Sequence, residues 1–374
     1  MDLSSVRIRE HFGLVSNDTH TGQFCFLVSP PENKGSVEKY DYVLIDHPLF
    51  GEVCQVLAVI TDITSYEEVA GSTIGDKMGK MLATAKIEGY IDLRSENRPM
   101  AKVLVPPNPG CRVYVPLKKF LEESLNRNAK GEVFKVPIQI GTFEGSSAQE
   151  QDSSGSIKCF IDAQELTSKH AIMTAVAGAG KTHTAKLLIQ EISAKTSSQI
   201  IVFDPYNEYS NSLETSAKAI VVNSKMDKDS MAKEIKKGQT SILNGYGLSP
   251  KEKRSFFIEA LQMLLKLRLE DKIKPLFLII EESENLIGET LEQVVSEGRK
   301  NGIFTCLITT NPAKLGGSVL SQIGTQIIGK TTNKEDIGYL ENMAGDSITL
   351  PDLTSGEWIV NGIIANRPLK VHVN

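Results

Sequence analysis

The sequence predicts an α/β protein in which a parallel-rich sheet follows a small amino-terminal β-barrel. Up to about residue 115, short apolar or alternating runs are separated by turn residues, and no long helix intervenes. From Ala171 onward, strand-like and helix-like segments alternate, which is typical of a parallel sheet covered on both faces. A loop of small residues that ends in Gly180-Lys181-Thr182 opens this second part.

Residues 1–115 are predicted to form the barrel. Several short strands without long helices between them favour such a fold, and apolar and polar residues alternate most clearly around Ile91. We found no catalytic constellation in this segment, because its histidines are isolated. The expected strands are residues 24–28, 42–45, 53–60, 87–93 and 103–105.

Residues 116–374 are predicted to form the second domain. A helical pattern over 116–128 bridges the two domains, and a polar tract near 144–156 is expected to be a mobile loop at a hairpin tip. A long amphipathic helix is expected to begin at Pro250. The expected strands are residues 136–143, 157–161, 199–203, 219–222, 241–243, 276–280, 303–309 and 326–328, with 358–360 and 369–373 as closing strands.

Bulk properties exclude several classes of protein. The 374 residues carry a net charge of -5, with 40% hydrophobic and 23% charged residues, as in ordinary globular proteins. No apolar run approaches the roughly 18 residues that span a bilayer, and the first residues lack the apolar region of a secretory signal. We therefore expect a cytoplasmic protein without a membrane partner. Five scattered cysteines without a C-x-x-C pair argue against both disulfides and a zinc site.

The loop before the first predicted helix of the second domain has the form of a phosphate-binding P-loop. Small residues let several backbone N–H groups point at one anion, and the helix that follows adds its positive end. Lys181 is expected to contact the β- and γ-phosphates of ATP, and the Thr182 hydroxyl to bind Mg²⁺. Ala175 stands where the usual motif has glycine, and a chance Gly-Lys-Thr in a surface turn is the alternative. The nucleotide-binding residues are thus predicted as Ala177, Gly178, Ala179, Gly180, Lys181, Thr182 and His183.

A second part of an ATP site is predicted about a hundred residues later. The apolar run of residues 276–280 ends in Glu281-Glu282, as in a buried strand whose terminal acids face the phosphates. Glu281 is expected to orient the Mg²⁺ shell, although aspartate is usual there, and Glu282 to activate the attacking water. A strand that merely ends in two solvated acids is the alternative.

Two further segments supply candidate catalytic residues. Thr310 and Asn311 follow the strand of residues 303–309, where a polar side chain would lie between the two motifs and sense the γ-phosphate. An Asx turn before proline is the alternative. Arg299 lies outside the apolar faces and is a candidate arginine finger for a neighbouring subunit, because a cationic fork stabilises charge on the γ-phosphate. A surface arginine is the alternative.

The order of these motifs resembles that of the HerA-type ATPases of archaea and some bacteria, members of the HerA/FtsK group of ring translocases. The chain is similar to this family in a barrel-like beginning, in an L-x-S-[RK]-H lead-in to the P-loop, and in a D-P-x-G-E-Y element. The segments that carry the resemblance are residues 42–56, 166–170, 204–209, 281–282, 297–300 and 320–322. This ordered set is more specific than the P-loop alone.

The resemblance implies a RecA-like P-loop domain and a hexameric ring with DNA in its central channel. ATP with Mg²⁺ would be hydrolysed at subunit interfaces, in the service of DNA translocation, helicase activity, DNA end processing or repair. It also implies a NurA-type nuclease as a possible partner. Residue by residue, Lys181 and Thr182 take the phosphate and Mg²⁺ roles, Glu282 activates water, and Arg299 becomes a finger in trans.

The sequence departs from the family at several positions. The family's T-Q-R-P segment has Thr310 and Asn311 in place of its Gln and Arg, and Ser283-Glu284 follow the acids where Ala-His is usual. These departures, with Ala175 and Glu281, motivate an alternative: a nucleotide-binding assembly protein that hydrolyses slowly or not at all. A small-molecule kinase would need an acceptor pocket and an Arg-bearing lid, which we did not find. A channel face and a solvated surface stay open for Lys225, Lys228, Lys236 and Lys237.

Overall fold

The computed structural model describes residues 3–29, 37–66, 80–143, 156–344, 350–365 and 367–373. The chain divides into two compact units, residues 1–133 with 142–159 and residues 134–141 with 160–374. The expected domain boundary at residue 115 stays a prediction. Most of the polar tract near 144–156, for which a mobile hairpin tip was expected, lies outside the described residues.

The first unit contains a six-stranded antiparallel sheet that is nearly closed. Its strand order is β3-β4-β5-β2-β1-β6, and Leu44 of β3 exchanges two backbone hydrogen bonds of 2.8 Å with Tyr114, just after β6. Phe24, Phe26 and Val56 are among its buried core residues. This arrangement is consistent with the expected small barrel. The strands are β1 (Gly13–Thr19), β2 (Gln23–Val28), β3 (Tyr42–His47), β4 (Gly51–Tyr66), β5 (Lys80–Asp92) and β6 (Arg112–Val113), followed by α1 (Lys118–Leu125).

The sequence prediction for this unit needs two corrections. The strand expected at residues 103–105 is wrong, because these residues form no strand. Pro106 and Pro107 follow directly, and proline cannot donate to a strand ladder. Conversely, β1 and β6 were not predicted: β1 ends in the polar run Ser16-Asn17-Asp18, and β6 is two residues long.

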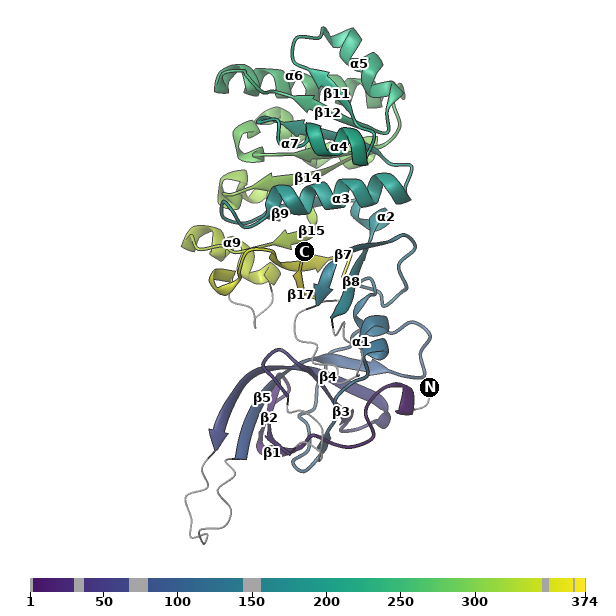
Figure 1. Cartoon of the computed structure of the whole chain (residues 1–374), viewed down its shortest axis with the longest axis vertical. Coiled ribbons are helices and arrows are strands. Elements are labelled where there is room, and N and C mark those ends of the chain that lie inside the picture. The colour runs from purple at the N-terminus through teal and green to yellow at the C-terminus, as the bar shows by residue number, and fades with distance from the viewer. Residues whose placement is uncertain are drawn as a thin grey trace. The chain divides into compact units, whose positions relative to one another are not determined.

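The second unit is built on an eleven-stranded mixed sheet with the order β11-β12-β10-β13-β14-β9-β15-β16-β17-β7-β8 (Figure 1). Neighbours from β11 to β15 are parallel, whereas the pairs β15–β16 and β16–β17 are antiparallel. The chain is therefore α/β with a large, parallel-rich mixed sheet. The strands are β7 (Pro137–Phe143), β8 (Ile157–Asp162), β9 (His170–Thr174), β10 (Gln199–Asp204), β11 (Ile220–Asn223), β12 (Thr240–Asn244), β13 (Leu276–Ile280), β14 (Ile303–Thr309), β15 (Ile323–Ile328), β16 (Glu357–Gly362) and β17 (Leu369–His372).

Helices connect the parallel strands. The long helix α6 begins at Pro250 as predicted, with a Ser249–Glu252 capping box at its amino end, and its Leu261 shares a core with Leu278 of β13 and Leu307 of β14. Helices α5, α7 and α9 were not predicted. The helices of this unit are α2 (Ala163–Leu166), α3 (Lys181–Lys195), α4 (Ser210–Ser216), α5 (Lys228–Lys237), α6 (Pro250–Leu269), α7 (Glu289–Glu297), α8 (Gly316–Leu320) and α9 (Lys334–Ala344).

The register of the parallel strands determines where the site lies. Thr309 of β14 pairs with Thr174 of β9, and Ile280 of β13 pairs with Leu307 of β14. The carboxyl ends of β9, β14 and β13 therefore lie at one edge of the sheet, with β14 between the other two. We call it the carboxyl edge, and the opposite one the amino edge.

Two observations, on membrane-spanning helices and on cysteines, are made of the described residues. In that part of the chain, no helix has the length and apolarity needed to cross a membrane. All five cysteines are free thiols, and each is buried except Cys111, which is partly exposed.

Candidate nucleotide site

The predicted P-loop connects β9 to α3 at the carboxyl edge. Gly178 and Gly180 have φ angles of +79° and +103°, a region that favours glycine. Ala175, which replaces the usual first glycine, is not among the residues with positive φ. The alanine therefore needs no strained backbone, and this departure is no obstacle to forming the loop.

The methyl group of Ala175 is accommodated by a glycine on the neighbouring chain segment. Ala175 is 1% exposed, and a Cβ added to Gly329 would lie 2.9 Å from the Ala175 Cβ and 3.0 Å from the Trp358 ring. Contacts that short force a shift. Gly329 thus leaves the space that Ala175 and Trp358 fill.

The side chain of Lys181 folds back onto its own loop. Its ammonium donates hydrogen bonds to the carbonyl oxygens of Ala175, at 2.9 Å, and Val176, at 3.1 Å. Burial lowers the pKa of Lys181, while four nearby acids act in the opposite direction. These acids are Glu281, Glu284, Glu282 and Glu208. The nearby charges that act most strongly on this lysine are therefore negative.

The first acid after β13, Glu281, is buried at 9% exposure. The Tyr209 hydroxyl donates to its Oε2 at 2.5 Å. Burial raises the pKa of Glu281 to about 7; the Tyr209 hydrogen bond and Lys181 oppose this rise, and Glu208 and Glu282 add to it. Glu281 is thus a carboxyl group that changes charge near neutral pH.

The second acid, Glu282, is partly exposed and has a left-handed backbone with φ of +50°. Such backbone is uncommon for residues other than glycine and concentrates at functional sites. The Tyr206 hydroxyl and the Asn285 amide both donate to Glu282 Oε2, at 2.6 and 2.9 Å. The hydrogen bond to Glu282 is the first cause that raises the pKa of Tyr206 to about 12. Glu282 is therefore oriented by two donors.

The turn at residues 204–209 follows β10 and contacts both acids and the P-loop helix. The Asp204 carboxylate accepts hydrogen bonds from the backbone N–H groups of Tyr206, Glu208 and Tyr209 at 3.0–3.3 Å. Asn207, where the resembled family has glycine, has φ of +63°, which asparagine tolerates better than most residues. The turn is thus fixed by its own sequence.

The same turn touches the residue predicted to bind Mg²⁺. The Thr182 hydroxyl donates to Glu208 Oε2 at 2.7 Å. Together with Tyr206 on Glu282 and Tyr209 on Glu281, this contact links one turn to three predicted site residues. Sequence reasoning gave no role to Tyr206, Glu208 or Tyr209, although the D-P-x-G-E-Y resemblance marked their segment.

The polar residues after β14 lie between the two motifs, as their strand's position predicted. The Thr310 hydroxyl donates to Glu284 Oε1 at 3.1 Å, and the Asn311 amide donates to the Thr310 hydroxyl at 2.9 Å. The other oxygen of Glu284 is buried and has no hydrogen-bond partner among the described residues. Glu284 is therefore a fourth acid at this edge, beside Glu208, Glu281 and Glu282, and the sequence presented it only as a departure.

The P-loop and the helix that follows it have three further features. His183 is exposed on the first turn of α3. Ser355 and Gly356 donate hydrogen bonds to the carbonyls of Gly178 and Ala179, each at 3.1 Å. These two supports of the loop come from far along the chain, and no sequence signal marked them.

Arg299 does not lie with the other predicted catalytic residues. It is exposed on a short 3-10 helix, Gly298–Asn301, that precedes β14. Its charge helps to lower the pKa of His170, the first residue of β9, after burial as the main cause. Both observations place Arg299 at the amino edge, about one strand length (~20 Å) from the P-loop.

The donor set fits a hard cation that keeps some of its water. The Thr182 hydroxyl and the carboxylates of Glu208 and Glu281 offer oxygen ligands, which Mg²⁺ prefers. No group of three or more His, Cys, Asp or Glu side chains that could hold a metal occurs within the described ranges. The residues therefore suit Mg²⁺ that shares its ligands with water and phosphate oxygens, rather than a metal held by protein alone.

Comparison with known proteins shows what this part of the chain is similar to. Residues 138–303 match the family model of the helicase HerA central domain. The chain is 25% identical over 206 residues to a probable helicase of Methanocaldococcus jannaschii, a match covering 54% of this chain and 36% of that protein. It is also 25% identical over 160 residues to the DNA double-strand break repair helicase HerA of Sulfolobus acidocaldarius, covering 37% and 32%. Each match thus spans about a third of the relative's length.

Among solved structures, the chain is similar to VirB4 of Thermoanaerobacter pseudethanolicus, with a TM-score of 0.47 and 12% identity. That match covers 64% of this chain and 96% of the other. Residues 138–303, which match that family model, hold the P-loop, the 204–209 turn and the acidic pair, and this match confirms the chain's predicted resemblance to HerA-type ATPases.

Proposed function

We propose that this chain is a Mg²⁺-dependent ATPase of the HerA type, and that it drives movement along DNA as a ring of subunits. One observation carries the proposal: the P-loop, the acidic pair and Thr310 come from separate segments and meet at one sheet edge. The 204–209 turn joins the Thr182 hydroxyl to both acids by hydrogen bonds. This is the set of groups that phosphoryl transfer to water requires.

The residues divide the chemistry between them. Backbone N–H groups of the loop and the amino end of α3 would bind the phosphates, with Lys181 neutralising the β- and γ-oxygens. When bound, Mg²⁺ supplies Lewis-acid stabilisation of phosphate charge, and Thr182, Glu208 and Glu281 are the residues that would hold it. Glu282, oriented by Tyr206 and Asn285, accepts the proton of the attacking water. Thr310 and Asn311 would contact the γ-phosphate.

Ring formation and DNA binding complete the proposal. Arg299 cannot serve the ATP site of its own chain from the amino edge, so a role in hydrolysis requires a neighbouring subunit. We place it as a finger in trans in a hexamer with DNA in the channel and a NurA-type nuclease as a possible partner. The HerA name of the relatives in two archaea, both DNA double-strand break repair helicases, supports DNA as the polymer and repair as the setting.

The sharpest test is Glu282→Gln, with exposed Glu292→Gln of α7 as a matched control. Glu282→Gln should lower ATP hydrolysis roughly 100-fold or more, because the base is lost, while ATP binding stays intact. Glu292→Gln should change neither quantity. Hydrolysis is measured with and without duplex DNA, and DNA should accelerate the wild type. Wild-type turnover no faster than that of the Glu282→Gln variant would instead support the nucleotide-binding assembly protein that hydrolyses slowly or not at all.

A further inference from the structure

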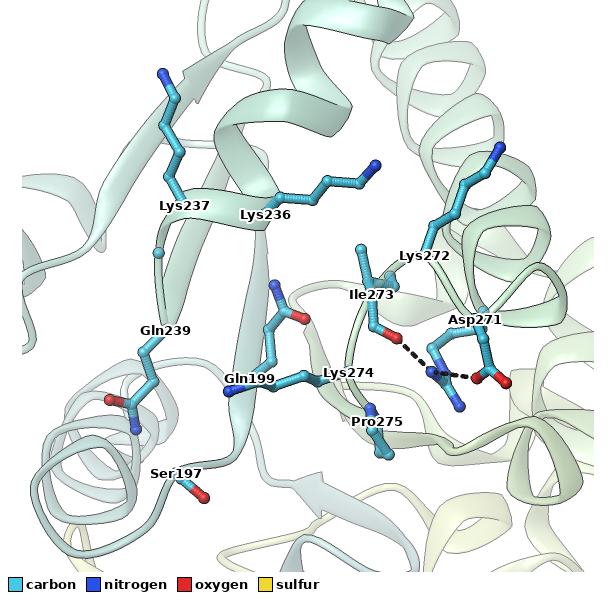
Figure 2. Close-up of a pocket in the computed structure, with 12 residues that line it drawn as sticks. Ser197, Gln199, Lys236, Lys237, Gln239, Asp271, Lys272, Ile273, Lys274 and Pro275 are labelled. Carbon is cyan, nitrogen blue, oxygen red and sulfur yellow. Dashed lines mark hydrogen bonds and ion pairs between the residues drawn. The ribbon is translucent and has the colours of Figure 1, made fainter.

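A pocket at the amino edge of the large sheet gathers positive charge. Its volume is about 660 Å³, and five of its twelve lining residues are lysine or arginine. They come from the end of α5, from the end of α6 and from the segment that leads to β13, and Gln199 at the start of β10 lies between these segments (Figure 2). From the sequence alone, Lys236 and Lys237 could face either a channel or a solvated surface.

The walls of this pocket are held by hydrogen bonds to backbone carbonyls. Arg268 donates to the carbonyl oxygens of Asn301, at 2.8 Å, and Ile273. Gln199 donates to Ile235 at 2.7 Å, and Gln239 donates to Thr196 at 2.6 Å. The pocket is therefore a built feature of the fold and not a gap between loose side chains.

The lysines of the pocket are only partly neutralised. Lys237 pairs with Glu234 at 2.5 Å and Lys272 pairs with Glu270 at 2.7 Å. Within the described part of the chain, the side chains of Lys236 and Lys274 make no hydrogen bond and no ion pair. The charge of Lys236 does add to the lowering of the Glu270 pKa, which the hydrogen bond from Lys272 mainly causes. The pocket thus keeps a net positive charge in a chain whose total charge is -5.

Helix ends account for some of these cations but not for all. Lys236 and Lys237 occupy the last turn of α5, where the helix dipole favours a positive charge. Lys272 also lies at a helix end, because its backbone N–H donates to the Leu267 carbonyl of α6 at 2.8 Å. Lys274 lies further along, in the segment leading to β13, and complements no helix end. Like charges held together oppose folding through their mutual repulsion, and a bound anion would offset that repulsion.

We propose that this pocket, named here the amino-edge pocket, binds clustered phosphate groups through Lys236, Lys272 and Lys274. Flexible ammonium groups suit phosphate oxygens as point charges, and the volume lies within the range of small-ligand sites. The phosphates could belong to a nucleic-acid strand or to a free polyphosphate. The pocket lies at the amino end of β10, whose carboxyl end leads into the 204–209 turn, so it is a separate site from the P-loop. The proposal for the amino-edge pocket does not depend on the ATPase proposal, and each is tested separately.

The test compares two triple variants of the full chain in a Lys181→Ala background, which removes the P-loop contribution. The pocket variant is Lys236→Gln, Lys272→Gln and Lys274→Gln. The control carries the same change at exposed lysines elsewhere: Lys102→Gln, Lys251→Gln and Lys334→Gln. Binding of tripolyphosphate and of a 20-nucleotide single strand is measured by calorimetry at several salt concentrations.

The pocket variant should bind at least one probe about tenfold or more weakly, with a shallower dependence on salt, whereas the control variant should match the parent. The probe that the parent binds identifies the source of the phosphates. Equal binding by the pocket variant and its parent would overturn the proposal. So would equal weakening in both triple variants, or a parent that binds neither probe. The single variant Lys236→Gln serves as a check if the triple variant fails to fold.

Discussion

The two edges of the large sheet differ in the sign of their charge. At the carboxyl edge, Lys181 lies among Glu208, Glu281, Glu282 and Glu284. At the amino edge, the amino-edge pocket is lined by five cations and one acid, Asp271. The same parallel strands run between them, so one scaffold holds an acidic site that suits a metal with a nucleotide and a basic site that suits phosphates alone. The lysines at the two edges therefore differ in their surroundings. Lys181 is surrounded by acids, whereas the lysines of the amino-edge pocket lie among other cations.

The largest expected difference is in ATP affinity, between a variant that lacks one lysine of the carboxyl edge and a variant that lacks one lysine of the amino edge. Lys181→Ala should weaken ATP binding roughly 100-fold or more, because the phosphates lose their partly buried cation. Lys236→Ala should leave the tight ATP site within about twofold. Titration with a fluorescent ATP analogue measures both. Weak ATP binding that persists in Lys181→Ala and disappears in the pocket variant would come from the amino-edge pocket, whereas equal losses in the two single variants would break the contrast.

In the proposed ring, Arg299 at the amino edge of one subunit contacts the ATP site at the carboxyl edge of the next subunit. Arg299→Ala should lower ATP hydrolysis roughly 1000-fold, as for other arginine fingers, with ATP affinity changed much less. Co-expression of Arg299→Ala with Glu282→Gln chains should restore part of the activity, because some interfaces then contain both intact residues. Lys300→Ala, at the adjacent exposed position, is the control. No recovery in the mixed assembly would contradict a finger in trans.

The smallest expected effect is a pH dependence of stability at the carboxyl edge. The pKa of Glu281 is raised from 4.5 to about 7, so the folded protein holds this proton more tightly than the unfolded chain. Stability from this group is therefore present below about pH 4.5 and is lost as pH rises through about 7. Glu281→Gln should match the wild type at pH 4.5 and melt roughly 5 °C higher at pH 8. Parallel pH profiles of the melting temperature for the two proteins would contradict this assignment.

The sequence predicted most of the second unit because its strands are continuous apolar runs with polar residues at their carboxyl ends. The strand of residues 303–309 was predicted to the residue, and the order of motifs placed Thr310 between the P-loop and the acids. The strands of the nearly closed sheet were harder to predict from the sequence, because β1 carries polar residues and β6 is very short. Residues 103–105 are apolar without joining a sheet, since apolar side chains can be buried without strand pairing.

The contacts that shape the site were not predictable in the same way. The hydrogen bonds from Tyr209 to Glu281 and from Thr182 to Glu208 join residues 72 and 26 positions apart. Which of several polar side chains meets which acid depends on the turn geometry that Asp204 fixes. The amino-edge pocket was hidden for a related reason: its lysines come from segments that meet only in the folded sheet.

Asp204 accepts hydrogen bonds from three backbone N–H groups of the 204–209 turn, which ties the parts of the turn to one another. The side chains of the turn contact Thr182, Glu281 and Glu282, the three residues proposed to hold Mg²⁺ and to activate water. Thermodynamic coupling is the consequence: the free-energy effects of substitutions at Tyr206, Glu208 and Tyr209 are not independent quantities that sum. Under the proposed function, a nucleotide or an adjacent subunit that displaced this turn would change metal affinity and water activation together.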